Sequence, residues 1–186
     1  GGLEWMDGIP GNVGGSLRMN AGAMGRDMIR NLVSVTCLDE DGEIRSHPSG
    51  DLNAQYRSIP DLAHNFVLQA VFEGSPCARE EIEEKLEDAR AKRRLSQPSG
   101  ASAGCIFKNP EEIPAGKLID ELGLKNACVG DACVSSVHAN FIINRGHARA
   151  RDITILIDMI RKEAMENRGI DLKSEAQVIG DREPQF

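Results

Sequence analysis

The sequence is poor in aromatic residues, has no excess of positive charge and contains no long apolar run. Aromatic residues make up 4% of the 186 positions, which argues against a stacking platform for single-stranded nucleic acid. The 22 basic and 29 acidic residues give a net charge of −7, which argues against a general phosphate-binding surface. No apolar stretch approaches the roughly 18 residues that a membrane span needs. We therefore expect no nucleic-acid partner and no membrane-embedded segment.

The five cysteines form no CxxC pair. Cys128 and Cys133 are followed by His138, but no fourth ligand is spaced to complete a zinc site. We therefore expect no metal and interpret the cysteines as reduced thiols. No signal peptide opens the sequence, and we expect a cytoplasmic protein.

Hydrophobic patterning predicts an α+β chain in two pieces. Strands are expected at 32–38, 43–47, 66–72, 127–134, 139–144 and 175–179, and helices at 75–94, 114–122 and 151–168. The strand at 66–72 is almost continuously apolar, which predicts burial on both faces. The Gly/Ser/Pro-rich stretch 96–104 predicts a linker, with a domain boundary after residue 97. Strands precede the first helix instead of alternating with helices, so α+β fits better than a parallel α/β sheet.

Glycine is concentrated at the start of the chain, where nearly half of the 19 glycines fall within the first 25 residues. The GIPG run at 8–11 and the pair Gly14-Gly15 are expected to break regular structure and to let the backbone approach a cofactor closely. The spacing is not the dinucleotide fingerprint GxGxxG, and the lysine of a P-loop is missing. On composition alone, a set of tight turns is an equally good interpretation.

The stretch GIPGNVGGSLRMNAGAMG at 8–25 resembles the flavin-binding segment of the UDP-N-acetylenolpyruvoylglucosamine reductase (MurB) family. Further family motifs follow in the same order: QYRS at 55–58, RR at 93–94, QP at 97–98, SAGCIFKNP at 102–110, AGKLID at 115–120, GLK at 123–125, HANF at 138–141 and EAQVIG at 175–180. The resemblance covers nearly the whole chain. Several ordered motifs are far more specific than any one of them.

The resemblance implies both a fold and a reaction. Residues 1–97 would form the second half of an FAD-binding domain of the PCMH type with its connecting helix, and 98–186 a smaller substrate-binding domain. The family's N-terminal lobe precedes this region, so we expect a truncated chain whose partner is its own missing lobe. FAD and NADPH are the implied cofactors. The implied reaction reduces the enolpyruvyl ether of UDP-N-acetylglucosamine to UDP-N-acetylmuramate, a peptidoglycan precursor.

The resemblance also implies roles for individual residues. Arg57 would pair with the substrate carboxylate, Cys105 would donate a proton to carbon, and Glu175 would polarise the carboxylate. The family normally has Ser at the position of Cys105, and a thiol is the stronger acid. Cofactor contacts are implied for Gly8, Ile9, Pro10, Gly11, Val13, Gly14, Gly15, Asn20 and Gly22. Substrate contacts are implied for Tyr56, Gln97, Lys108 and Asn109.

Two alternatives stay open at this stage. One is an FAD-linked oxidase of related fold, and the other is a degenerate copy that binds a UDP-sugar without catalysis. Without the resemblance, Arg57 and Glu175 would be interpreted as surface charges. The basic run 92–94 is either a phosphate contact or the charged end of a helix, and His138 is interpreted as a structural hydrogen-bonding residue.

Overall fold

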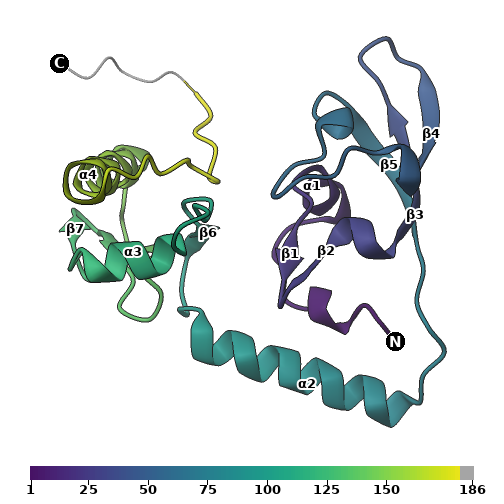
Figure 1. The fold of residues 1–186 in the computed structure, drawn as a ribbon, viewed down its shortest axis with the longest axis horizontal. Helices are drawn as coiled ribbons and strands as arrows, with labels where there is room; N and C mark the ends of the chain where they lie inside the picture. Colours follow the sequence, from purple (N-terminus) through teal and green to yellow (C-terminus); the bar gives the residue numbers. More distant parts are fainter. Residues whose placement is uncertain (181–186) are drawn as a thin grey trace. The chain divides into compact units, whose positions relative to one another are not determined.

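A computed structural model describes residues 1–180, which divide into two compact units (Figure 1). The first unit is Gly1–Arg93, and the second begins at Arg94. Each unit combines helices with a short antiparallel sheet, which confirms the α+β prediction. In this part of the chain, no helix is long and apolar enough to cross a membrane.

The division between the units falls inside helix α2 (Arg79–Ser96), ahead of the linker where we expected it. Side chains of the helix explain this position. Arg90 forms an ion pair with Asp7 at 2.7 Å, and Arg93 donates a hydrogen bond to the Trp5 carbonyl at 3.3 Å. These contacts join most of α2 to the first unit.

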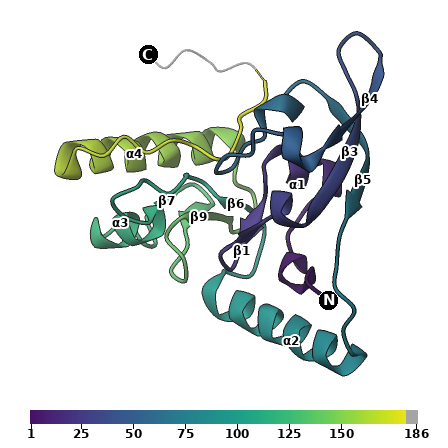
Figure 2. The same cartoon turned by 45° about the vertical axis from the view of Figure 1, so that its right-hand side comes forward.

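The first unit is built on an antiparallel sheet of three strands in the order β4-β3-β5. Strands β3 (Leu32–Leu38) and β5 (Phe66–Phe72) have the predicted bounds, and β4 (Ile44–Pro48) is shifted by one residue. Helix α1 (Val13–Arg18) packs against β5 (Figure 2). The buried core comprises Trp5, Leu17, Met28, Leu32, Val35, Cys37, Ile59 and Leu62.

Two predictions for the first unit are wrong. Strand β5 is not buried on both faces, since Phe66 is 73% exposed and Leu68 is exposed as well. The glycine-rich segment does not avoid regular structure either, because α1 forms within it. Asn12 caps this helix, and its side-chain oxygen accepts a hydrogen bond from the Gly15 N–H at 3.0 Å. An N-cap of this kind stabilises a helix whose interior glycines disfavour it.

Short elements complete the first unit. Strands β1 (Gly22–Ala23) and β2 (Arg26–Asp27) form a small hairpin. Short 3-10 helices lie at Glu4–Met6, Met28–Asn31, Ser49–Asp51 and Pro60–Leu62. Helix α2 begins at Arg79 and not at Ser75, whose N–H instead donates to the Gly1 carbonyl at 2.8 Å.

The second unit has a four-stranded antiparallel sheet in the order β6-β9-β8-β7. The strands are β6 (Ser102–Cys105), β7 (Cys128–Val129), β8 (Ala132–Val134) and β9 (Phe141–Asn144). Helix α4 (Ala150–Arg168) packs on β7 and β8, and it contacts the shorter α3 (Ala115–Glu121). Gly169 ends α4 in the left-handed conformation at φ 66°, as the sequence predicts.

The segment 127–134 forms a hairpin, although one continuous strand was predicted. Cys128 and Cys133 occupy directly paired positions in this hairpin and are joined by a disulfide. The interpretation of all five cysteines as reduced is therefore wrong for this pair. Within residues 1–180, Cys37, Cys77 and Cys105 are not disulfide-bonded.

His138 has the structural role that the sequence predicted. Its Nδ1 accepts a hydrogen bond from the Asn140 N–H at 3.2 Å, and its ring meets Phe141 edge-on with the ring centres 5.0 Å apart. Burial lowers the pKa of His138, which favours the neutral ring. In the neutral ring, an unprotonated Nδ1 can accept the hydrogen bond from the Asn140 N–H.

Asn140 is a buried polar residue at the centre of the second unit, with 2% of its surface exposed. Its side-chain oxygen accepts from the Phe107 N–H at 2.9 Å, and its side-chain nitrogen donates to the Phe107 carbonyl at 2.8 Å. Its own carbonyl accepts from the Ile106 N–H at 2.9 Å. The amide thus satisfies both backbone polar groups of a buried residue, as a neighbouring strand would.

We expect Asn140→Asp to destabilise the chain by roughly 1–3 kcal/mol, because the carboxylate cannot donate to the Phe107 carbonyl. Urea unfolding followed by circular dichroism measures the loss. Asn144→Asp is the matched control, because the Asn144 side-chain oxygen accepts from the Gly146 and Ala148 N–H groups and a carboxylate oxygen can accept the same hydrogen bonds. Equal stability of the two variants would contradict this role for Asn140.

Candidate active site

Arg57 lies at the tip of a tight turn in the first unit. Gln55 and Ser58 close the turn through reciprocal backbone hydrogen bonds of 2.8 and 3.2 Å. Arg57 adopts the left-handed conformation at φ 57°, which residues with a Cβ rarely adopt. Its guanidinium donates to the Gly22 carbonyl at 3.2 Å and lies 4.8 Å from the centre of the Tyr56 ring. The turn thus presents a fixed cation beside an aromatic ring.

Gly22 is packed so closely that a side chain would not fit without movement. A Cβ at this position would lie 2.7 Å from the Arg26 carbonyl oxygen and 2.9 Å from Nη1 of Arg57. The structure therefore brings together Gly22, predicted as a cofactor contact, and Tyr56 and Arg57, predicted for substrate. The absence of a side chain at Gly22 leaves room for the arginine.

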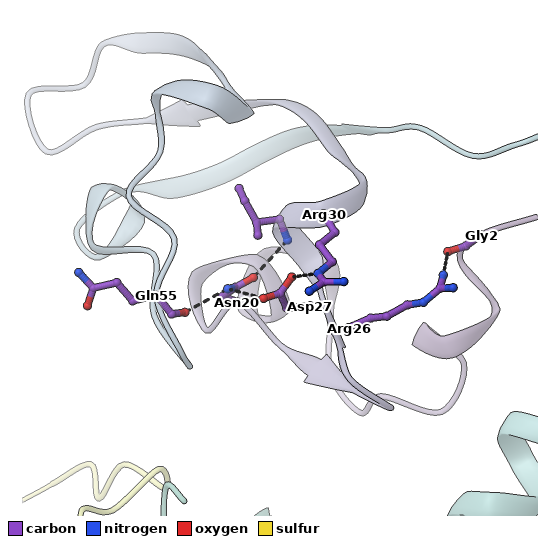
Figure 3. Close-up of polar contacts among 7 residues, drawn as sticks. Gly2, Asn20, Arg26, Asp27, Arg30 and Gln55 are labelled. Atoms are coloured by element: carbon purple, nitrogen blue, oxygen red, sulfur yellow. Dashed lines mark hydrogen bonds and ion pairs between the residues drawn. The ribbon is translucent and has the colours of Figure 1, made fainter. Parts of the chain in front are cut away.

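Asn20 lies next to this cluster and is buried, and Figure 3 shows its contact with Gln55. Its side chain contacts the Gln55 carbonyl, at the base of the arginine turn, and the Ile29 N–H. The predicted cofactor contact of Asn20 stays a prediction, but its amide has defined partners within the protein.

The other predicted cofactor residues differ in what surrounds them. Pro10, Gly11 and Val13 are exposed, and Gly11 has φ +100° with no atom within 4 Å of the place a Cβ would take. This open, partly apolar stretch fits the close approach of a flat cofactor such as a flavin. Gly14 is different, because a Cβ there would lie 3.4 Å from the Val67 Cβ, where α1 packs on β5.

The three remaining cofactor candidates have contacts within the first unit. Gly8 adopts φ +76°, and a Cβ there would lie 3.2 Å from the Arg93 side chain. Ile9 packs against the core of the unit. Gly15 donates its N–H to the capping side chain of Asn12. These contacts account for conformation and packing, and the cofactor roles stay predictions.

Cys105 ends β6 directly after an irregularity in the pairing with β9. The register passes from Ser102 opposite Ile143 to Cys105 opposite Phe141, so β6 carries an extra residue. Gly104 supplies the left-handed conformation that this bulge uses, at φ +77°. Bulges re-aim the following side chain and recur beside active sites. Sequence reasoning did not single out Gly104, although a glycine immediately before the expected proton donor was the available signal.

Glu175 is held by a backbone hydrogen bond next to the segment that follows Cys105. Its N–H donates to the Ile106 carbonyl at 2.7 Å, one residue beyond Cys105. Next to it, Ser174 pairs with Phe107 in an isolated antiparallel bridge. The strand predicted at 175–179 is wrong, since the bridge at Ser174 is not extended and the Glu175 and Ala176 N–H groups both donate to the one Ile106 carbonyl. The backbone contact nevertheless places Glu175 beside Ile106, the residue that follows Cys105 in the chain.

The predicted substrate residues Gln97, Lys108 and Asn109 belong to the second unit. The Asn109 side-chain oxygen accepts from the Ala115 N–H at 3.0 Å, at the start of α3, and the Lys108 N–H donates to the Lys173 carbonyl at 2.8 Å. Gln97 is exposed just after α2. Within residues 1–180, no three His, Cys, Asp or Glu side chains are grouped to hold a metal ion.

Comparisons of the chain with a family model and with known proteins identify the same family. The family model for the C-terminal domain of UDP-N-acetylenolpyruvoylglucosamine reductase matches residues 96–179. A Bacillus licheniformis protein of that name is 40% identical over 97% of this chain and 100% of its own length. The chain belongs to the UDP-N-acetylenolpyruvoylglucosamine reductase family.

Other relatives of the reductase family are longer than this chain. The Syntrophus aciditrophicus protein of the same name is 41% identical, and the match covers 97% of this chain but 58% of that protein. The crystal structure of the Thermus caldophilus reductase (MurB) matches with a TM-score of 0.83 and 36% identity, covering 95% of this chain and 64% of that one. The chain thus spans about 58% of the first of these relatives.

We expect Gly22→Ala to destabilise the first unit by roughly 1–3 kcal/mol, because the new methyl group must displace backbone at Arg26 or the Arg57 side chain. Urea unfolding followed by the fluorescence of Trp5, the single tryptophan, measures the change. Gly50→Ala is the control, since a Cβ there would meet nothing within 4 Å. If both variants unfolded at the same urea concentration, the close packing at Gly22 would not contribute to the free energy of unfolding.

Proposed function

We propose that the protein containing this chain reduces the enolpyruvyl ether of UDP-N-acetylglucosamine to the lactyl ether, which gives UDP-N-acetylmuramate. The observation that carries the proposal is that the chain belongs to this reductase family, and the backbone hydrogen bond from Glu175 to Ile106, the residue after Cys105, supports it. We place the reaction in the cytoplasm and in peptidoglycan precursor synthesis. In that compartment the Cys128–Cys133 pair would face a reducing thiol pool.

The cofactors of the proposed reaction are FAD and NADPH. When bound, they supply the hydride that adds to the methylene carbon of the substrate. The exposed stretch with Pro10, Gly11 and Val13 is the part of this chain that best fits contact with the flavin. The residues proposed to hold the cofactor are Gly8, Ile9, Pro10, Gly11, Val13, Gly14, Gly15 and Gly22. Asn20, which the resemblance also implies as a cofactor contact, has its side-chain amide engaged by Ile29 and Gln55 within the protein.

Arg57 is proposed to stabilise the charge that develops on the substrate. After hydride adds to the methylene carbon, negative charge spreads over the neighbouring carbon and its carboxylate. A guanidinium suits this task because it stays charged and pairs a carboxylate with two parallel hydrogen bonds. The fixed turn that carries Arg57 supports the role, since a preorganised cation costs no reorganisation during the reaction.

Cys105 is proposed to complete the reduction by donating the Sγ proton to the charged carbon. The resulting thiolate regains a proton from solvent, so the protein returns to its starting state. Glu175 is proposed to polarise the substrate carboxylate, which a protonated carboxyl group does by donating a hydrogen bond. The remaining substrate contacts are proposed for Tyr56, Gln97, Lys108 and Asn109.

The direct test uses the complete product of the gene that encodes this sequence. A yellow protein that oxidises NADPH only when the enolpyruvyl substrate is present, and releases UDP-N-acetylmuramate, would support the proposal. A flavoprotein that instead consumes oxygen with its own substrate would indicate an FAD-linked oxidase. A colourless protein that binds UDP-sugars would indicate a non-catalytic copy.

We expect Arg57→Ala to slow reoxidation of the flavin by the enolpyruvyl substrate by ~10²–10³, because one preorganised electrostatic contact is lost. Reduction of the flavin by NADPH should be nearly unchanged. Stopped-flow absorbance measures the two half-reactions separately. Impaired reduction with normal reoxidation would contradict the role given to Arg57.

We expect Cys105→Ala to block protonation at carbon and Cys105→Ser to preserve it, because a methyl group cannot supply a proton while a hydroxyl can. Single-turnover rates, with deuterium incorporation from heavy water into the lactyl product, measure the step. Full activity of the Ala variant would transfer the donor role to water or to another side chain.

A further inference from the structure

Asn20 is a buried polar residue whose side-chain contacts link two distant segments of the first unit. Only 2% of its surface is exposed, and it lies between α1 and β1 with a left-handed φ of 39°. Its oxygen accepts from the Ile29 N–H at 3.1 Å. Its nitrogen donates to the Gln55 carbonyl at 3.0 Å and lies 3.5 Å from the Asp27 carboxylate (Figure 3). Both ends of the amide are therefore engaged inside the protein.

The Gln55 carbonyl is the important partner, because it closes the turn that carries Arg57. The same carbonyl accepts from the Ser58 N–H at 3.2 Å. On the other side of the turn, the Ile59 N–H donates to the Arg18 carbonyl at 3.1 Å. Both ends of the turn are thus attached to the segment 18–20, and Asn20 provides the side-chain attachment.

The turn needs such an attachment because its own conformation is disfavoured. Arg57 is left-handed, and residues with a Cβ hold that conformation only where surrounding contacts impose it. The guanidinium then reaches the Gly22 carbonyl at 3.2 Å, two residues after Asn20. The segment 20–22 therefore contacts the arginine turn twice, at its backbone and at its charged group.

We propose that Asn20 is a positioning residue for Arg57, which acts by fixing the Gln55–Ser58 turn without touching substrate or cofactor. The inference rests on the proposed function for the catalytic importance of Arg57. The fixed position of the turn follows from the contacts alone. Displacement of a reacting group by about 1 Å costs on the order of a hundredfold in rate.

The experiment uses the complete gene product and two variants of Asn20. Asn20→Gly removes the amide while keeping the left-handed backbone accessible, since glycine adopts it without strain. Asn20→Asp keeps the acceptor for Ile29 and loses the donor to Gln55. Asn126→Gly is the matched control, because Asn126 is an exposed asparagine that is also left-handed, at φ 64°.

Three results are expected for Asn20→Gly relative to the control. Hydrogen exchange at the Ser58 amide should accelerate. Reoxidation of the flavin by the enolpyruvyl substrate should slow by about tenfold to a hundredfold, with flavin content and reduction by NADPH unchanged. The double variant Asn20→Gly/Arg57→Ala should be no slower than Arg57→Ala, because Asn20 acts through the arginine. Asn20→Asp should show the same pattern.

Three other results would overturn the inference. Ser58 exchange equal to that of the control would show that Asn20 does not set the turn. A further loss of rate in the double variant would show an effect independent of Arg57. Loss of flavin would make Asn20 a cofactor contact instead. If Arg57→Ala itself kept full activity, the proposed function of Arg57 would fail, and Ser58 exchange alone would decide whether Asn20 positions the turn.

Discussion

The second unit depends on the backbone hydrogen bonding of the segment Ile106–Lys108, in which Ile106 and Phe107 are buried. Its backbone groups must find partners because burial removes them from water. Asn140 accepts from the Ile106 N–H through its carbonyl and pairs with both backbone polar groups of Phe107 through its side chain. The returning segment 173–175 donates to the Ile106 carbonyl and accepts from the Lys108 N–H. The segment is therefore paired on both sides. This pairing places Glu175 beside Ile106, the residue that follows Cys105.

In the first unit, a second buried asparagine, Asn20, also provides hydrogen-bond partners for backbone groups. Asn20 and Asn140 are each 2% exposed, and each uses its amide to accept from one backbone N–H and to donate to one backbone carbonyl. An asparagine amide can replace the edge of a missing strand because it carries the donor and the acceptor of a peptide group. In both units the segment held in this way leads directly to a residue of the proposed reaction, Arg57 in one and Cys105 in the other.

Much of the fold could be predicted from the sequence, and the failures have physical causes. Strands β3 and β5 were found because they are short runs rich in β-branched and apolar residues, and helix α4 because its apolar residues recur on one face and Gly169 ends it. Helix α1 was missed because its glycines disfavour a helix, while the cap from Asn12 and packing on β5 stabilise it. The strand expected at 175–179 did not form because the bridge at Ser174 is isolated and the next two N–H groups share the Ile106 carbonyl instead of extending a ladder.

The candidate site shows why residue type alone gives an incomplete account of a glycine-rich motif. The resemblance assigned Gly22 and Asn20 to the cofactor together with the exposed Gly11. Their surroundings differ: no atom lies within 4 Å of a Cβ at Gly11, whereas the Gly22 carbonyl accepts from the Arg57 guanidinium and the Asn20 side chain donates to the Gln55 carbonyl of the arginine turn. A substitution in this motif can therefore impair the arginine without touching the flavin. Loss of activity alone would not distinguish the two causes, but flavin content measured beside the separate half-reactions does.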